Sequence, residues 1–156
     1  MLGKESASSN KDANPSFSLN LVSRLITRFF DRRLATLGIN VAHLPVLGAL
    51  RASSPRSQGE LVRIGQIGQP AMAQMLARMV KDGLLVRKTD PDDGRKAQFA
   101  LSANAIGLME HVRTTLAEGN RDVFDVLTDE ELAAFMASLR KIETSLKTSM
   151  GAQQDE

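Results

Sequence analysis

Hydrophobic residues recur at helical spacing through the first third of the chain. Residues 17–37 are predicted as a helix because their apolar positions return every three or four residues, and Gly38 follows as a stop. Asn40 is a good N-cap for a second predicted helix over residues 41–52. A break at Ser53-Ser54-Pro55 ends that helix.

The next segment has the pattern of a helix-turn-helix. Ser57 and Glu60 form a capping box that opens a short helix over residues 57–64. A glycine-containing turn at 65–68 leads to a helix over 70–82, which begins with proline. The predicted buried stripe of this last helix consists of its large apolar residues: Met72, Met75, Leu76 and Met79.

A hairpin pattern follows. Residues 84–88 read as a short strand, 89–95 as a polar turn, and 96–101 as the returning strand, in which apolar and polar residues alternate. A helix-turn-helix followed by a hairpin with a basic tip is typical of a winged helix. In that arrangement the second helix fits the major groove of DNA, and the hairpin reaches the neighbouring minor groove or phosphates.

Two long helices complete the chain. Ser102 is predicted to cap a helix over 103–127, and Thr128 with Glu131 forms a second capping box for a helix to residue 150. The last helix carries one apolar stripe made of Leu132, Phe135, Met136, Leu139, Ile142 and Leu146. We expect these helices to form a dimer with those of a second chain; the alternative is that they fold back on their own lobe.

The predicted fold class is mainly α with a small β-hairpin wing. We expect a flexible tail over residues 1–16 and an N-terminal helix of the dimerisation region over 17–37. A winged helix-turn-helix lobe follows over 38–102, then C-terminal dimerisation helices over 103–150. Residues 151–156 are expected to be a second tail.

Charge is segregated along the chain although the net charge is only +2. Residues 1–102 carry 15 Lys and Arg against 8 Asp and Glu, whereas residues 103–156 carry 5 against 10. A basic part joined to an acidic part favours a polyanion-binding lobe with another region attached. The alternative is a solvated surface with uneven charge.

Composition excludes several classes of site. The chain has no Cys, Trp or Tyr and only two His, His43 and His111, which argues against disulfides, thiol redox sensing, and zinc or iron–sulfur sites. We find no nucleophile–base pair, no Gly-rich phosphate loop and no metal-ligand set, so we expect neither an enzyme nor a cofactor. Because no apolar run of about 20 residues and no export signal is present, we expect a cytoplasmic protein without a membrane partner.

Several motifs in order resemble the MarR family of winged helix-turn-helix transcriptional regulators. The strongest segment is residues 82–95, which resembles the end of the family's recognition helix and its wing, including the D-x-R motif at Asp93 and Arg95. The match is collinear from about residue 19 to 148. Shorter similar pieces are Gly38-Ile39, Val46-Leu47 with Leu50, Ser57-Gln58-Gly59-Glu60-Leu61 and Leu101-Ser102.

Four residues of the predicted recognition helix lie off its buried stripe and are our candidates for DNA contact. Gln69 and Gln74 can make paired hydrogen bonds to adenine, and Ala71 can touch a thymine methyl group. Arg78 is expected to meet phosphate. For Gln74 and Arg78 a solvated helix face is the alternative. Gln69 is a poorer helix cap than the Ser or Thr usual in the family.

Four further DNA-binding candidates belong to the wing. Arg95 at its tip suits a narrow A·T-rich minor groove, and Lys88 and Lys96 are candidates for nonspecific phosphate contact. Asp93 resembles the family's acid that orients the wing arginine, although it could be an ordinary turn residue. Gly94 stands where the family often has a second arginine, which weakens the expected phosphate grip.

The resemblance also implies a small-molecule cleft between the dimer helices and the DNA-binding lobe. Arg24, Arg28 and His43 could meet a carboxylate there, and Phe29 or Phe30 could supply an apolar wall. The alternative is that the arginines are solvated or paired with acidic side chains.

We therefore expect a homodimeric, sequence-specific regulator of transcription that binds a pseudo-palindromic operator in double-stranded DNA. We expect a repressor that is released by a small ligand such as an aromatic carboxylate. The alternatives are a constitutive or architectural DNA binder without a ligand, and a protein-interaction module whose winged helix no longer touches DNA.

Overall fold

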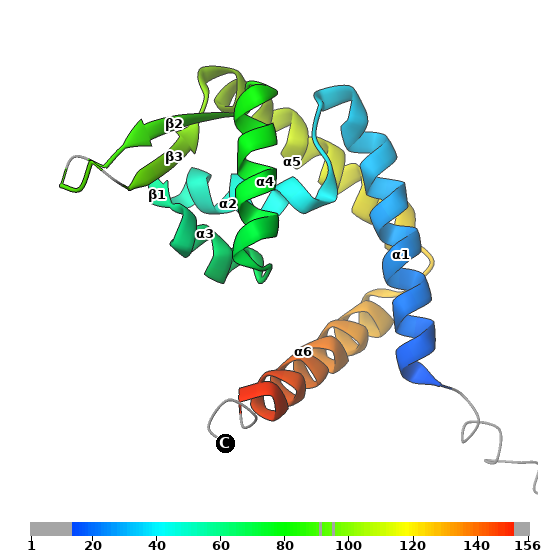
Figure 1. Cartoon of the computed structure of the whole chain (residues 1–156). Helices are drawn as coiled ribbons and strands as arrows, with labels where there is room; N and C mark the ends of the chain where they lie inside the picture. Colours follow the sequence, from blue (N-terminus) through cyan, green and yellow to red (C-terminus); the bar gives the residue numbers. More distant parts are fainter. Residues whose placement is uncertain (1–13, 91, 95, 152–156) are drawn as a thin grey trace, which may run out of the picture. The chain divides into compact units, whose positions relative to one another are not determined.

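The computed structural model describes residues 14–90, 92–94 and 96–151, and divides the chain into two compact units, Met1–Thr115 and Leu116–Glu156 (Figure 1). Short 3-10 turns at Ala35–Leu37 and Val41–His43 connect the first two helices. The helices are α1 (Pro15–Leu34), α2 (Leu44–Ala52), α3 (Gln58–Gly65), α4 (Gln69–Lys81), α5 (Ala103–Phe124) and α6 (Asp129–Gly151). The strands are β1 (Arg56–Ser57), β2 (Leu85–Thr89) and β3 (Ala97–Leu101).

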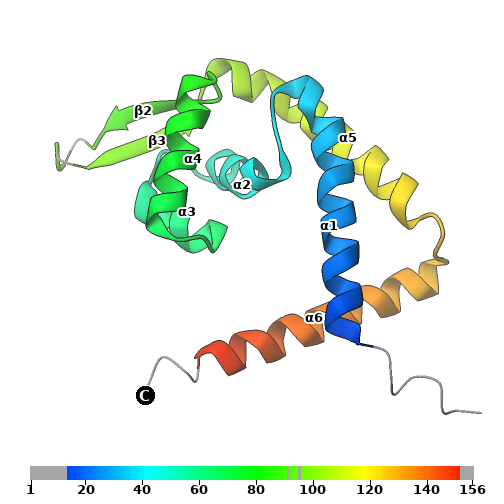
Figure 2. The ribbon, with the colours of Figure 1, turned by 45° about the vertical axis from the view of Figure 1, so that its right-hand side comes forward.

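The predicted fold class, mainly α with a small hairpin wing, is confirmed. β2 and β3 pair antiparallel with Leu85 opposite Leu101 and Thr89 opposite Ala97. The hairpin extends away from the end of α4 in both ribbon views (Figures 1 and 2). The sequence did not predict β1, whose Arg56 lies opposite Phe99 and completes a sheet with strand order β1-β3-β2.

The hydrophobic core of the first unit joins α1, α2, α3, α4, the sheet and the first half of α5. The predicted stripe of α4 is confirmed, because Met72, Met75, Leu76 and Met79 are all buried. The core also holds Phe30, Leu34, Ile39, Val46, Leu47, Leu50, Leu61, Leu84, Leu85, Phe99, Ala100, Ala105, Met109 and Val112. The division between the units therefore falls within α5, whereas the sequence suggested a boundary at residues 102 and 103.

The predicted helix caps at Ser57, Ser102 and Thr128 are present. Glu60 N–H donates to the Ser57 hydroxyl at 3.3 Å while the Glu60 carboxylate accepts from Ser57 N–H at 2.8 Å. Thr128 and Glu131 repeat this reciprocal pair at the start of α6. Ala105 N–H donates to the Ser102 hydroxyl at 3.0 Å, which caps α5.

Several predicted boundaries were wrong by a few residues. The first helix begins at Pro15 because the Asn14 side chain accepts from Phe17 N–H at 3.1 Å, so residues 15 and 16 do not belong to a tail. Gly151 still belongs to α6, and α5 ends at Phe124 rather than at residue 127. Residues 1–13 and 152–156 of the predicted tails lie outside the described part of the chain.

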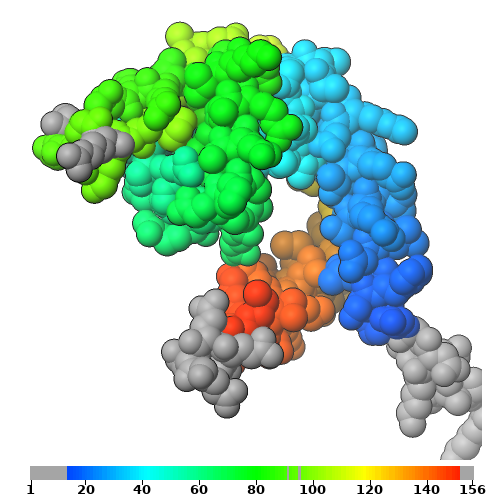
Figure 3. Space-filling model, viewed as in Figure 1, coloured from blue at the N-terminus to red at the C-terminus, as the bar shows by residue number. Residues whose placement is uncertain are grey.

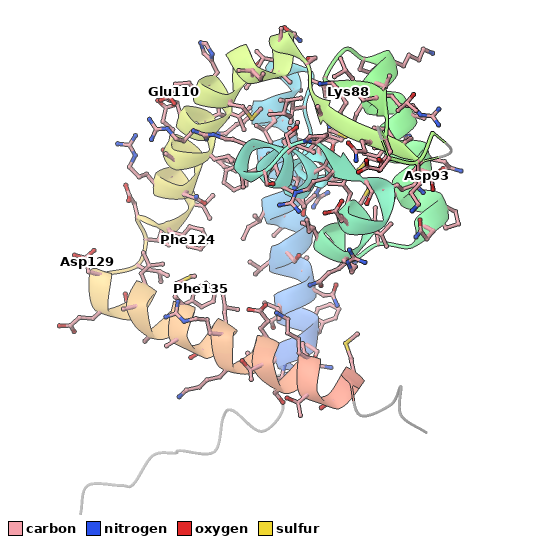
Figure 4. The ribbon with its side chains drawn as sticks, turned by 90° about the vertical axis from the view of Figure 1, so that its left-hand side faces the viewer. Lys88, Asp93, Glu110, Phe124, Asp129 and Phe135 are labelled. Atoms are coloured by element: carbon pink, nitrogen blue, oxygen red, sulfur yellow. The ribbon has the colours of Figure 1, made fainter. Side chains whose placement is uncertain are left out.

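The second unit contains the end of α5 and all of α6. The rings of Phe124 and Phe135 face each other with centroids 6.3 Å apart (Figure 4). The described part of α6 contains no buried residue. Ile142, Leu146 and Met150 are 46%, 56% and 66% exposed, so the second half of the apolar stripe of this helix is exposed.

Candidate nucleic-acid interface

The turn between α3 and α4 fixes how the two helices pack. α3 ends with Gln66 in the left-handed conformation at φ +52°, and Gly68 is the N-cap of α4. A Cβ on Gly65 would lie 2.9 Å from the Cε methyl group of Met72, so a larger residue at this position would push that buried methyl group aside. The predicted helix-turn-helix is therefore a tightly packed pair whose second helix is α4.

The outer face of α4 carries the four DNA-contact candidates of this helix. Gln69, Ala71, Gln74 and Arg78 are all exposed, while the opposite stripe is buried. α4 lies at the surface of its unit beside the wing (Figure 3). The side chains are thus free to meet another molecule; their base and phosphate contacts remain predictions.

Gln69 has a neighbour that sequence reasoning missed. Gln58, the first residue of α3, donates a hydrogen bond from its side-chain amide nitrogen to the Gln69 amide oxygen at 3.0 Å. The two residues are eleven positions apart in sequence. Neither the periodicity nor the capping signal reports such a contact, since it arises only when α3 and α4 pack.

The wing tip is held by Asp90. Its carboxylate accepts from Asp92 N–H and from the Gln98 side-chain amide, both at 2.9 Å. The bond from Asp92 N–H, followed by that from Gln98, keeps the pKa of Asp90 below its ordinary value. Asp90 therefore stays ionised and links the turn to β3; the sequence identified it only as a turn residue.

The predicted DNA-binding residues of the wing differ in their surroundings. Lys88 is exposed on β2, and the Lys96 ammonium lies 3.4 Å from the Asp93 carboxylate (Figure 4). Arg95 lies outside the described residues, so the predicted contact between Asp93 and Arg95 stays a prediction. In this structure Asp93 pairs with a lysine of the wing.

Basic side chains gather around one hollow of the wing. It has a volume of about 310 Å³, and the cationic residues in its lining are Arg87, Lys88 and Lys96. The rest of the lining comes from Thr89, Gly94 and Ala97. Such a hollow suits an anion such as a phosphate group.

The two ends of the wing meet at one point. The Ser102 hydroxyl donates to the Gly83 carbonyl at 2.6 Å, and Ser102 N–H donates to the Leu84 carbonyl at 3.0 Å. Gly83 has φ +75°, a conformation that favours glycine and ends α4. The end of α4 is thereby bonded to the start of α5.

The predicted ligand-binding residues are only partly gathered. Arg24 and Arg28 are exposed on α1. Phe29 is half-buried, with the Arg33 guanidinium 4.7 Å from its ring centroid and the Phe30 ring edge-on at 5.2 Å. Phe30 itself is 6% exposed and belongs to the core of the first unit, which leaves Phe29 as the better candidate for an apolar wall.

His43 has a structural role that the sequence did not indicate. Its Nδ1 accepts from Asn40 N–H at 3.4 Å, while the Asn40 side chain accepts from His43 N–H at 3.2 Å. Burial lowers the pKa of His43, an effect that the nearby Asp82 carboxylate opposes. A largely neutral imidazole that already caps a helix is a weak partner for a carboxylate, which weighs against its predicted ligand role.

The described residues offer neither a metal-binding cluster nor a single helix that could span a membrane. Within residues 14–90, 92–94 and 96–151, no group of three His, Asp or Glu side chains could hold a metal ion. No single helix in the same ranges is long and apolar enough to cross a membrane. Residues 15–37 and 41–52 reach that length and hydropathy only when taken together across an 82° bend.

The model of the MarR family matches residues 37–96 of this chain. That segment contains α2, β1, α3, α4 and β2, the elements of the interface described above. This segment is therefore similar to the MarR family of winged helix-turn-helix regulators. The resemblance noted from its sequence motifs is therefore confirmed.

Curated relatives of this chain agree with that similarity. The HTH-type transcriptional regulator YsmB of Bacillus subtilis is 33% identical over 89 residues, which span 57% of this chain and 61% of that protein. The multiple antibiotic resistance protein MarR of Escherichia coli is 23% identical over 80% of this chain and 87% of that protein. The relatives of the family are transcriptional regulators, in agreement with the prediction that this chain is not an enzyme.

Solved structures share the fold of this chain. A mutant of Escherichia coli MarR in complex with operator DNA has a TM-score of 0.75 at 23% identity, over 81% of this chain and 91% of that one. The MepR–DNA complex of Staphylococcus aureus has a TM-score of 0.76 at 22% identity, over 86% and 99%. At this level of identity the likeness establishes the winged helix-turn-helix fold.

Proposed function

We propose that this chain is a homodimeric, sequence-specific DNA-binding regulator of transcription. The observation that carries the proposal is the exposed outer face of α4, which lies beside a basic wing in a fold shared with two operator-bound or DNA-bound proteins. α4 enters the major groove, where Gln69 and Gln74 pair with bases and Arg78 meets phosphate. The protein acts in the cytoplasm, without a membrane partner.

The wing supplies affinity rather than sequence selection. Lys88 and Lys96 neutralise phosphates, and Arg95 enters the minor groove with Asp93 beside it. The hollow lined by Arg87, Lys88 and Lys96 supports this role because it gathers three cations within one short hairpin. Each phosphate contact makes binding weaker as salt rises.

Dimer formation uses the apolar faces of the terminal helices. The exposed stripe of α6 supports this, and so do Leu21, Val22 and Leu25 of α1, which are 42%, 46% and 49% exposed. A two-fold dimer presents two copies of α4, so the operator is an imperfect palindrome. Its half-sites lie about one helical turn, ~10 base pairs, apart.

The regulator represses until a small aromatic carboxylate releases it from DNA. Arg24 and Arg28, one helical turn apart and both exposed, support an anionic ligand, with Phe29 as its apolar wall. The burial of Phe30 and the capping role of His43 favour a second candidate, a constitutive DNA binder without a ligand. Titration of aromatic carboxylates into the protein–DNA complex separates the two, with an Arg24→Ala, Arg28→Ala variant to test the anchor.

DNA binding is tested by selecting bound duplexes from a random pool. We expect a palindromic site, and Gln74→Ala should lose about 1–3 kcal/mol at particular base pairs. Lys88→Ala should weaken binding to all sequences alike and reduce the salt slope by roughly one. Lys141→Ala in α6 is the matched control and should change neither. A pool that yields no enriched sequence would overturn sequence-specific binding.

A further inference from the structure

We infer that Gln58 and Gln69 act as one unit in which Gln58 sets the base preference of Gln69. This inference rests on the proposed DNA-binding function and names a specificity determinant outside α4. Its basis is the hydrogen bond from the Gln58 amide nitrogen to the Gln69 amide oxygen at 3.0 Å, which joins the first residue of α3 to the first residue of α4.

The backbone holds both ends of this hydrogen bond in place. Gln58 directly follows Ser57, whose N–H and hydroxyl both donate to the Glu60 carboxylate at 2.8 Å in the capping box of α3. Gln69 lies between the N-cap Gly68 and Pro70, whose ring fixes its own backbone φ. The two side chains are therefore presented from rigid helix starts.

The hydrogen bond also decides which way the Gln69 amide faces. A glutamine amide has an oxygen with two lone pairs and a nitrogen with two hydrogens. With its oxygen toward Gln58, Gln69 directs its NH₂ group away from α3 and keeps one lone pair for another donor. Adenine offers an N7 acceptor and an N6–H donor in the major groove, which match this orientation.

Gln58 is thus a positioning residue that acts through Gln69. The half-buried Gln58 orders the exposed Gln69 before DNA arrives, so that less side-chain freedom is lost on binding. Loss of this support should affect the discrimination among bases at one position in each half-site. It should not affect binding to random DNA, which depends on phosphate contacts.

Two substitutions at Gln58 test the inference, and duplex selection and competition measure the base preference of each variant. Gln58→Ala should reduce discrimination for adenine at one position by about two- to tenfold, the effect of one hydrogen bond. In Gln58→Glu the new carboxylate can only accept hydrogen bonds, so it should accept one from the Gln69 NH₂ group. The Gln69 amide oxygen should then face DNA and shift the base preference toward cytosine, whose N4 donates.

Matched controls separate positioning from charge and from folding. Gln66→Glu places the same charge in the same helix-turn-helix, at a side chain that is not hydrogen-bonded to Gln69 in the described residues, and should lower affinity without changing base preference. Gln69→Ala should abolish the preference, and adding Gln58→Ala to it should cause no further loss of discrimination. Without DNA, Gln69→Ala should also shift the NMR resonances of the Gln58 side-chain amide.

The inference is wrong if wild-type protein selects a base at this position and Gln58→Ala selects it equally well. Unshifted Gln58 amide resonances in Gln69→Ala would overturn it without any use of DNA. A wild-type protein that selects no sequence would instead overturn the proposed function, and this inference with it.

Discussion

The two units of the chain use the same sequence signal in different ways. Both contain amphipathic helices with apolar residues at helical spacing, yet every buried hydrophobic residue of the described chain lies between Phe30 and Val112. α4 buries its stripe completely, whereas α6 leaves Ile142, Leu146 and Met150 exposed. A hydrophobic stripe therefore reports that a helix needs a partner, but not whether the same chain supplies it.

This contrast predicts different consequences for similar substitutions. In the first unit a truncated side chain leaves a cavity that neighbours cannot fill. In α6 the same truncation removes surface that water already reaches. The apolar stripe of α6 should matter for assembly rather than for the folding of one chain.

The largest expected effect is loss of the dimer. Replacing Ile142 and Leu146 together by Asp should raise the dimer dissociation constant at least about a hundredfold, because two unpaired carboxylates would enter an apolar interface. Sedimentation velocity measures the change. The control variant with Thr144→Asp and Thr148→Asp puts the same charges on the opposite face of α6 and should remain dimeric. Equal sedimentation of the two variants would contradict a dimer built on this stripe.

A matched methionine pair compares the two units directly. This comparison uses the monomeric variant with Asp at positions 142 and 146 as its background. There, Met79→Ala should lower the free energy of unfolding by about 2–5 kcal/mol, because Met79 is fully buried in α4. Met150→Ala, at a position 66% exposed, should change it by less than about 0.5 kcal/mol. Urea denaturation measures both values, and similar losses would show that α6 contributes to a core within one chain.

A matched serine pair should give a smaller difference. Ser102→Ala removes the cap of α5 and the bond to the Gly83 carbonyl, and should cost about 0.5–2 kcal/mol. Ser138 only bonds back to the Ala134 carbonyl within α6, so Ser138→Ala should be neutral or slightly stabilising. Thermal unfolding compares the two; a neutral Ser102→Ala would mean that the joint between α4 and α5 does not depend on this hydroxyl.

The smallest expected effect depends on pH. The two hydrogen bonds from Ser57 keep the pKa of Glu60 below its ordinary value. The ionised side chain therefore stabilises the fold at every pH above that ordinary pKa. The stabilisation should be lost as pH falls below about 4.3 and through the pKa of the folded state. The difference in Tm between wild type and Glu60→Gln should therefore shrink with acidification. A difference that stays constant from neutral to acidic pH would contradict this origin.

Local signals in the sequence were enough to predict most elements. The stripe of α4 and the capping boxes at Ser57 and Thr128 depend on residues at most a few positions apart, and all of them are present. β1 was missed because two residues carry no periodicity, and Arg56 with Ser57 becomes a strand only by pairing with β3. Ala100 is buried although strict alternation would expose it, since β3 is the central strand.

The candidate site was less predictable because its side chains depend on contacts between elements. The exposed positions of α4 follow from helical geometry, so Gln74 and Arg78 could be chosen from the sequence. The contact between Gln58 and Gln69 requires the packing of α3 on α4, and no pattern within either helix contains it. The burial of Phe30 and the cap formed by His43 likewise depend on how α1 meets the segment before α2.

The bonds from Ser102 to Gly83 and Leu84 close the hairpin at its base, so the wing leaves the fold and returns to it at one place. The length of the wing can therefore change without altering the path of the rest of the chain. Residues could be added to or removed from the turn between β2 and β3 while the end of α4 and the start of α5 keep their positions. Natural variation or engineering can thus adjust the reach of the wing along a duplex as an independent module.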